Sequence, residues 1–396
     1  MLKNTIIYAF RLTVLIIAML SAQCAAADSK DDLNPVQTGV AALNIAPDAR
    51  AAAMGDAGAA TEADVNSQYW NPSKYAFAYS SAGIGLSYTP WLRKLVKDIF
   101  LANVAGYWKI GSGDNQAVSA SFRYFSIGTI TTSEMTIHPN DLAFDIGYAR
   151  KLSSKYSMAV VLRYIYSNQG YASQADQAKG ASAFGADISG YFTTYPMVGN
   201  SECQFSFGWN ISNIGSKLSY NGGNDVAYLP TNLRLGLSFA FPLADYHTLA
   251  VTADANKLLV PTKPRRSDYS SDSDGQTQYT EDLEKWKSRS PISGIFKSFS
   301  DGSFKEEMRE INFSIGLEYN YNHRFFLRAG YHYEHPTKGN RQYFGFGAGF
   351  ALNILSLDAG YVLASSQSSP LDQTLRFTLT FDLEGIRNLI GKRKNK

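Results

Sequence analysis

Cysteine is scarce in this sequence, in which only Cys24 and Cys203 occur among 396 residues. Cys24 lies in an N-terminal stretch that we expect to be removed on secretion. Cys203 would then stand alone, and a single cysteine cannot form an intrachain disulfide. We therefore expect a fold without disulfides, in which Cys203 is a strand residue rather than a reactive thiol.

Residues 1–27 have the pattern of a secretory signal peptide. A positively charged start is followed by an apolar run over 12–20 and by three alanines before Asp28, which is the form that such peptides take. The run is too short to cross a bilayer as a helix. The alternative is a lipoprotein acylated at Cys24, but Gln23 stands where a small residue is usual.

Charge and long apolar runs are also scarce. Only 18% of residues are charged and the net charge is +3, which argues against nucleic acid as a partner. No apolar run after residue 27 is long enough for a transmembrane helix, so a helical membrane protein is excluded. Aromatic residues make up 13% of the chain, with 25 Tyr and 23 Phe. Few charges and many aromatics are typical of an outer-membrane barrel with aromatic girdles.

Recognisable catalytic patterns are missing as well. The sequence has no G-x-S-x-G, no P-loop and no H-E-x-x-H, so we expect no enzyme, metal or cofactor. Gly345, Gly347 and Gly349 alternate with phenylalanines on an expected strand, whereas a dinucleotide site needs glycines at a strand-to-helix turn. His332 and His335 are three residues apart on a strand end and point to opposite faces, so we expect surface or girdle positions for them.

Fourteen segments read as β-strands, and the fold class that they predict is all-β, a 14-stranded antiparallel transmembrane barrel. Short turns alternate with longer loops rich in Gly, Ser and Asn along the chain, which is typical of such barrels. The expected strands are 83–89, 99–109, 116–130, 141–151, 156–168, 181–195, 203–212, 231–241, 247–256, 310–321, 324–334, 342–352, 355–364 and 373–383.

The expected organisation has four parts. A polar start and a compact segment occupy 28–80, and the barrel covers 81–384. One loop, 257–309, is a long surface insertion, and residues 385–396 form a basic tail. Since an even strand number returns the chain to its starting side, we expect both chain ends in the periplasm.

Alternate residues of each expected strand are apolar, so one face suits lipid and the other suits the lumen. The expected lumen face carries charges of mostly alternating sign on neighbouring strands, which could pair across strands. We hypothesise a ring of ion pairs that holds the N-terminal segment; a solvated polar lumen is the alternative. The residues are Arg123, Asp145, Arg163, Asp187, Arg234, Asp254, Glu318, Arg328, Asp358 and Arg376.

The segment that precedes the strands is unlike them. Residues 49–60 are dominated by Ala and Gly, and residues 69–73 read Tyr-Trp-Asn-Pro-Ser. Small residues permit close backbone approach and Pro72 ends a helix, so a plug surrounded by strands is indicated. This stretch resembles the hatch of FadL-type outer-membrane barrels, most closely that of the PorV family of the type IX secretion system. The residues that carry the resemblance are Arg50, Met54, Gly55, Asp56, Gly58, Trp70, Asn71 and Pro72.

The resemblance implies a non-catalytic role in type IX secretion. It implies a barrel in the outer membrane, in contact with lipid and lipopolysaccharide. Such a barrel collects cargo bearing a C-terminal signal domain from the Sov translocon and passes it to an attachment complex of the PorU sortase, PorQ and PorZ. PorU then cleaves the signal and joins the cargo to anionic lipopolysaccharide. The alternatives are a FadL-type channel for hydrophobic small molecules and an accessory barrel similar to PorQ.

Two surface stretches are candidates for partner binding. Residues 91–99 could form a short rim helix with one apolar and one basic face, suited to lipopolysaccharide phosphates or a partner. The insertion combines basic and aromatic residues, and a loop of this length is usually functional or disordered. The candidate residues are Trp91, Arg93, Lys94 and Lys97 in the first stretch, and Arg265, Arg266, Trp286, Phe296 and Phe299 in the second.

Overall fold

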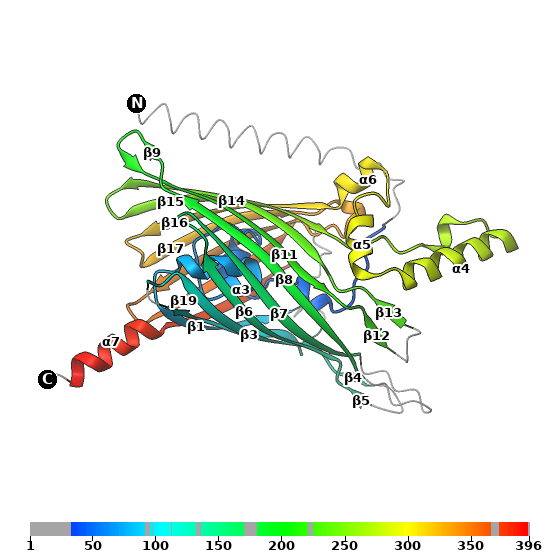
Figure 1. Cartoon of the computed structure of the whole chain (residues 1–396), viewed down its shortest axis with the longest axis horizontal. Helices are drawn as coiled ribbons and strands as arrows, with labels where there is room; N and C mark the ends of the chain where they lie inside the picture. Colours follow the sequence, from blue (N-terminus) through cyan, green and yellow to red (C-terminus); the bar gives the residue numbers. More distant parts are fainter. Residues whose placement is uncertain are drawn as a thin grey trace.

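Alternating apolar and polar residues produce a closed antiparallel barrel of fourteen strands (Figure 1). The computed structural model describes residues 33–91, 96, 98–111, 113–131, 136–169, 180–220, 225–365 and 372–394. Neighbouring strands pair in chain order, and β1 closes the barrel by pairing with β20. The barrel strands are β1 (Ala82–Pro90), β2 (Ile99–Ile110), β3 (Gln116–Ile127), β6 (Asn140–Lys151), β7 (Tyr156–Asn168), β8 (Ala181–Thr194), β11 (Gln204–Gly215), β14 (Asn232–Ala244), β15 (His247–Leu258), β16 (Ile311–Tyr321), β17 (Phe325–Tyr333), β18 (Tyr343–Ala351), β19 (Leu355–Ala364) and β20 (Thr374–Asp382).

Each predicted strand corresponds to one barrel strand, so the predicted fold class is confirmed. The ends differ by three residues at most. One such difference is at β11, which continues to Gly215 because an irregularity between Ile211 and Ile214 restores its pairing with β8. Three small hairpin sheets extend beyond the barrel: β4 (Ile130–Thr131) with β5 (Thr136–Ile137), β9 (Met197–Val198) with β10 (Ser201–Glu202), and β12 (Leu218–Tyr220) with β13 (Asp225–Ala227).

The two faces of the wall differ in polarity, as the alternation predicts. In β20, Thr374, Arg376 and Thr378 are buried, whereas Leu375 and Phe377 are exposed. The same burial alternation recurs in β1, β7 and β8. Apolar side chains thus cover the outside, where a membrane would lie, and polar side chains face the interior. None of the helices in the described part of the chain is long and apolar enough to cross a membrane.

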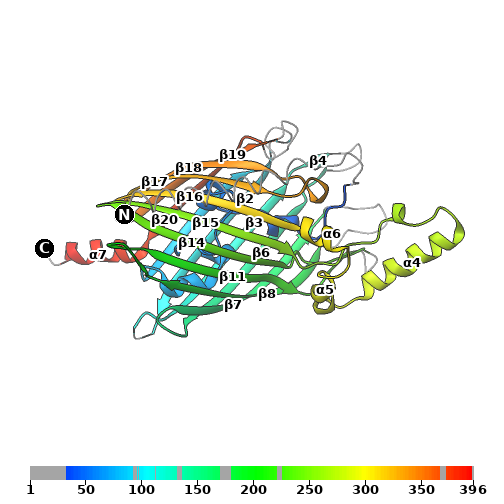
Figure 2. The ribbon, with the colours of Figure 1, turned by 90° about the horizontal axis from the view of Figure 1, so that it is seen from above.

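Helices lie inside the barrel and at its two ends (Figures 1 and 2). The interior elements are η1 (Ala41–Asn44), α2 (Ala49–Ala53), α3 (Ser67–Trp70) and η2 (Pro72–Phe77). The insertion contains η4 (Arg266–Asp268), α4 (Ser273–Ser288), α5 (Pro291–Lys297) and α6 (Phe304–Arg309). η5 (Pro336–Lys338) lies in the loop after β17, and the predicted basic tail is part of α7 (Leu383–Lys394). α4 and α7 extend from opposite ends of the barrel (Figure 2).

The prediction places both chain ends on one side, whereas the described residues, 33 to 394, begin and end at opposite ends of the barrel. The amide of Asn34 donates to the carbonyl of Thr337 in η5, and the amide of Gly39 donates to Tyr228, both in long loops. At the other end Ser80 donates to Asp382, next to α7. The N-terminal segment (residues 33–81) therefore runs through the barrel from the long-loop end to the short-turn end. Strand counting missed this because the segment crosses without being a strand.

Glycines on the wall let this segment approach closely, because glycine has no side chain. A Cβ on Gly330 would lie 2.1 Å from the carbonyl carbon of Met54, and one on Gly345 would lie 2.2 Å from the carbonyl oxygen of Ala52. Gly345 and Gly347 therefore face inward beside α2, as their alternation with phenylalanines indicated. Gly55 itself has a φ of 67° and lies against the backbone of Tyr331. Wall and segment thus require each other's small residues.

We expect Gly330→Val to destabilise the barrel by about 3 kcal/mol or more, because the added side chain overlaps the backbone of Met54 and overpacking typically costs 1–3 kcal/mol. The measurement is the temperature to which samples must be heated before the folded band on a gel shifts to the position of the unfolded chain. Ala329→Val is the matched control, since this neighbour points outward. Equal transition temperatures for the two variants would contradict the close packing.

Candidate functional site

Polar residues of the N-terminal segment stabilise its own short helices. Asp48 caps α2 by accepting from the amide of Ala51 at 2.9 Å, and the indole of Trp70 donates to the same carboxylate at 2.6 Å. Asn71 caps η2 through Ser73, and Pro72 occupies the first turn of η2. An Asp before an alanine run is a recognisable helix start, yet the sequence analysis missed Asp48.

Charged residues of the wall bind this segment directly. Arg50 pairs with Glu318 at 2.8 Å, and Arg376 pairs with Asp56 at 3.0 Å. Asp254 accepts from the amides of Gly58 and Ala59 at 2.8 and 2.9 Å. The motif residues thus contact the predicted lumen charges, although the two sets are far apart in sequence.

Two arginines bind the segment through carbonyl groups. Arg123 donates to the carbonyl of Ala42 at 2.9 Å, and Arg234 donates to the carbonyl of Tyr69 at 3.2 Å. Both guanidinium groups also lie over the ring of Tyr69. The two buried guanidinium groups thus interact with backbone carbonyl groups and with the face of an aromatic ring.

The remaining charges pair within the wall. Arg163 lies between Asp145 at 2.6 Å and Asp187 at 3.0 Å. Arg328 lies between Glu318 at 2.6 Å and Asp358 at 2.5 Å. In the described residues the charges therefore form two wall triads, of which the one around Arg328 also contacts the segment through Arg50 and Glu318. The hypothesis of one continuous ring is corrected, because Arg123, Arg234 and Asp254 bind backbone groups of the segment.

Lys74 is a charged residue that the sequence did not single out. Its side chain is fully buried, and Nζ donates to the carbonyl of Gly58 at 2.8 Å and to Thr61 at 3.0 Å. His332 likewise is not at the surface: it is buried, stacks on Tyr343 and hydrogen-bonds Ser314. The predicted surface or girdle position of His332 is wrong because its side chain points inward.

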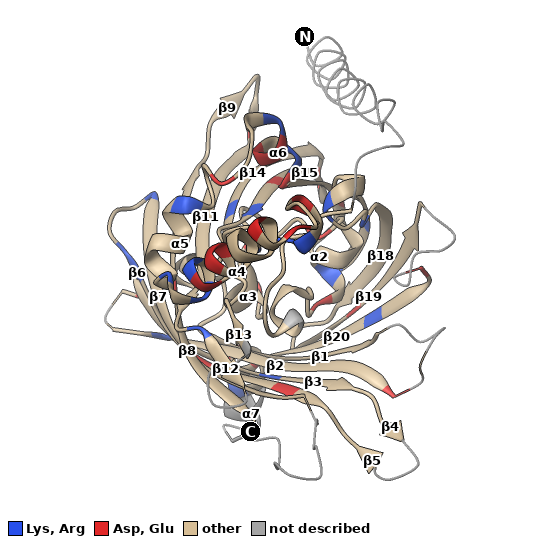
Figure 3. Cartoon of the chain, turned by 90° about the vertical axis from the view of Figure 1, so that its right-hand side faces the viewer, with Lys and Arg blue, Asp and Glu red and all other residues tan. Residues whose placement is uncertain are grey.

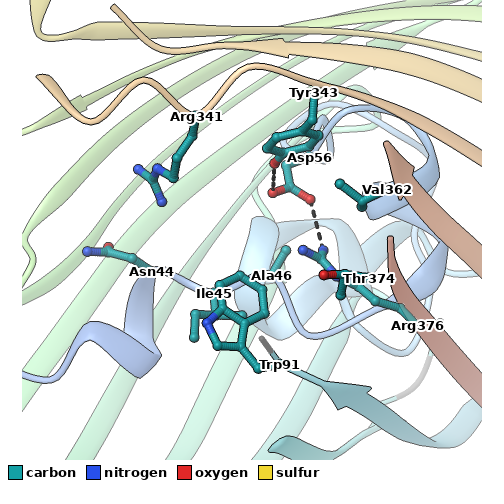
Figure 4. A pocket seen from close by; sticks show the side chains of 10 residues that line it. All are labelled: Asn44, Ile45, Ala46, Asp56, Trp91, Arg341, Tyr343, Val362, Thr374 and Arg376. Atoms are coloured by element: carbon teal, nitrogen blue, oxygen red, sulfur yellow. Dashed lines mark hydrogen bonds and ion pairs between the residues drawn. The ribbon is translucent and has the colours of Figure 1, made fainter. Parts of the chain in front are cut away.

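A small polar pocket lies between the segment and strands β18–β20 (Figure 4). Asp56 accepts hydrogen bonds from Tyr343 and Arg376 there, and Trp91 closes one side. Its volume of about 10 Å³ suits about one water molecule. A second interior cavity, lined by Arg50, Glu62 and strand hydroxyls, has a volume of about 40 Å³. Neither offers room for an organic cofactor, and the described residues include no cluster suited to a metal ion.

The predicted partner-binding residues have different surroundings. Arg93, Lys94 and Lys97 lie outside the described residues, and Trp91 is half-buried beside β18–β20. Arg265 pairs with Asp268, and Arg266 binds Gln276 and the carbonyl of Ser270, so both arginines organise the insertion itself.

The aromatic residues of the insertion divide into two groups. Trp286, one of the residues predicted to bind a partner, is buried. Its indole donates to the carbonyl of Pro261 at 2.9 Å, and its ring contacts Tyr228. Phe296 and Phe299 are 73% and 51% exposed. Trp286 therefore attaches the insertion to the barrel, while the phenylalanines remain available.

We expect Arg163→Met to lower the free energy of unfolding by about 3–5 kcal/mol, because it leaves two buried carboxylates without their cation. Denaturant titration of the refolded barrel measures this. The matched control combines Arg163→Met with Asp145→Asn and Asp187→Asn, which removes all three charges and should recover most of the loss. A single variant as stable as the wild type would show that the triad is solvated and weak.

Several solved structures resemble this one. The toluene transporter TodX of Pseudomonas putida has a TM-score of 0.47 and 11% identity, with coverage of 89% of this chain and 100% of that chain. A Pseudomonas aeruginosa FadL homologue has a TM-score of 0.44 and 11% identity, with coverage of 85% and 98%. The CymD monoaromatic hydrocarbon channel has a TM-score of 0.45 and 10% identity, with coverage of 87% and 97%.

The family comparison is more specific. No curated protein matches the chain. The model of a family described as type IX secretion system protein PorV matches residues 28–265, which is more than half of the sequence. The match includes the N-terminal segment and the strands from β1 to β15. The chain therefore belongs to the PorV family and is a β-barrel component of the type IX secretion system in the outer membrane.

Proposed function

We propose that this barrel binds secreted cargo through the C-terminal signal domain of the cargo after translocation. It then delivers the cargo to the attachment complex that contains the PorU sortase, for cleavage and linkage to anionic lipopolysaccharide. Family membership supports a role in this secretion system. The proposed partners are the Sov translocon, PorU, PorQ and PorZ.

The filled interior is the observation that favours binding over conduction. Ala49, Trp70, Asn71 and Tyr75 are at most 2% exposed inside the barrel. The two cavities described above have volumes of about 10 and 40 Å³, and each suits at most a few water molecules rather than a solute. A barrel closed in this way is suited to presenting an outer surface to other proteins.

We propose no catalysis by this chain, and the surroundings of its charged residues support this. Arg163 and Arg328 pair with carboxylates of the wall, and Asp254 accepts backbone amides. These groups are engaged in structure. In the proposed scheme the chemistry belongs to the sortase.

The insertion is the proposed partner contact at the cell surface. α4 projects beyond the barrel rim (Figures 1 and 2), and it is fixed at its base by Trp286 and Leu283. α4 also carries three exposed charged residues, Glu281, Glu284 and Lys285. We propose that the long loops face outside, which places α7 in the periplasm. We also propose that residues 1–27 are a signal peptide.

In a strain that lacks this chain, we expect cargo with the C-terminal signal domain to accumulate uncleaved in the periplasm. Without a carrier, the sortase would receive no substrate. Immunoblotting of fractionated cells measures this, and complementation with the intact gene is the control. Normal cargo attachment together with reduced uptake of long-chain hydrophobic compounds would instead support a FadL-type channel.

We expect deletion of residues 265–304 to reduce co-purification of partner proteins while the barrel still assembles. The deletion removes α4 and α5 but leaves β15 and β16 intact. The folded band on unheated gels reports barrel assembly. Unchanged partner recovery from a folded deletion variant would exclude the insertion as the docking surface.

A further inference from the structure

The two short helices of the insertion expose their apolar residues. In α5, Ile292 and Phe296 are 63% and 73% exposed, and in α6, Phe304 and Met308 are 82% and 47% exposed. Each pair is four residues apart, so its members share one helix face. Phe299, just after α5, is also exposed. An apolar face of this kind marks an interaction surface.

The opposite faces of these helices are small or polar, and they contact the protein. In α5, Gly294 lies against Tyr228 and Pro261, and Ser298 after it is buried. Beside the apolar residues of α6, Glu307 and the following Glu310 bind Lys257 at 2.9 and 2.6 Å. The amphipathic pattern is therefore reversed relative to a helix that packs on a soluble core.

A second lysine completes the attachment of α6. Lys338 of η5 binds Glu306 at 3.0 Å and Glu310 at 3.2 Å. Burial alone would raise the pKa of Glu306, but the hydrogen bonds from Lys338 and Arg309 hold it below its usual value. Ion pairs thus fix α6 to one strand, β15, and to one loop, the loop that contains η5, and its apolar face cannot simply rotate inward.

The position of Lys257 shows on which side of the wall α6 lies. In β15 the inward side chains include Thr252, Asp254 and Asn256, so Lys257 points outward. Its cross-strand partner Ile311 also belongs to the outer face. Because Lys257 is covered by α6, this helix lies on the outside of the barrel rim rather than over its mouth.

The views agree with this placement. Seen from the long-loop end, α5 and α6 lie at the edge of the barrel beside β11, β14 and β15, whereas α4 projects toward the viewer (Figure 3). Below them, the outer wall continues with exposed Leu235 and Leu237 of β14 and Leu317 of β16. The exposed apolar residues of the helices and those of the wall therefore belong to the same outer side of the barrel (Figure 3).

We propose that α5 and α6 form an interfacial apron that rests in the headgroup–acyl boundary of the outer leaflet. The apron is the surface made by Ile292, Phe296, Phe299, Phe304 and Met308, and its occupant is the lipid surface. Lys305 is exposed beside Phe304, and cations beside aromatics favour this boundary. The apron fixes the base of α4 at the membrane, so that α4 projects from a defined height. A protein partner on the same face is the opposing outcome of the test.

The test is depth-dependent fluorescence quenching in the full mature chain. Phe304→Cys and Phe296→Cys are made separately in a Cys203→Ser background, labelled with an environment-sensitive dye and reconstituted in phosphatidylcholine vesicles. Acyl chains brominated near the headgroup quench from the lipid, and iodide quenches from water. Leu162→Cys on the outer face of β7, where Leu162 is 67% exposed, is the lipid control. Gln278→Cys on the exposed surface of α4 is the aqueous control.

We expect both apron labels to lose emission to brominated lipid as the Leu162→Cys label does, with little loss to iodide. The Gln278→Cys label should show the reverse. Apron labels that iodide quenches and brominated lipid does not would overturn the proposal and leave the face to a protein partner. The folded band on unheated gels confirms that each variant folds. Because the two apron positions lie on separate helices, the test still stands if one of the two variants does not fold.

Discussion

The close approach between the N-terminal segment and the barrel wall is the constraint on which the rest of the structure depends. Met54 and Gly55 lie against Gly316 and Gly330 at distances that a Cβ would block. Backbone contact at this range fills the interior without bulky side chains. It also fixes the height of the segment, which brings Asp56 to Arg376 and Arg50 to Glu318.

Buried charges depend on that placement. Asp254 would have no backbone donors without Gly58 and Ala59, and Arg123 would lose the carbonyl of Ala42. An unpaired buried charge is costly, whereas a paired one contributes modestly. The charges therefore specify where the segment lies more than they stabilise it. Emptying the barrel would require these groups to find water or new partners.

The long-loop end combines three parts of the chain that are distant in sequence. Residues 33–39, the loop before β14 and the insertion meet around Tyr228 and Trp286. The entry of the N-terminal segment is therefore coupled physically to the base of α4. A secretion partner that binds α4 would therefore contact an element whose base touches the segment that fills the barrel. In our proposal α5 and α6 face the membrane instead.

The sequence by itself determined the strands, the outward and inward faces, and the presence of a small-residue plug. The strands and their faces follow from local periodicity, since alternate residues of a strand must point to opposite sides. The plug follows from its run of small residues. Local signals also showed that Gly345 and Gly347 face inward. The fourteen barrel strands could thus be predicted, whereas the helices of the insertion and the three small hairpins were not.

Only the tertiary structure decided which charges meet, where the segment enters and what the insertion buries. Arg123 and Arg163 are both inward-facing arginines, yet one binds carbonyls and the other binds two aspartates. Trp286 and Phe296 are both aromatic residues of one loop, yet one is buried and the other is exposed. These differences arise from cross-strand register and from long-range contacts with the N-terminal segment and the loops. Periodicity along a single strand carries no information about either.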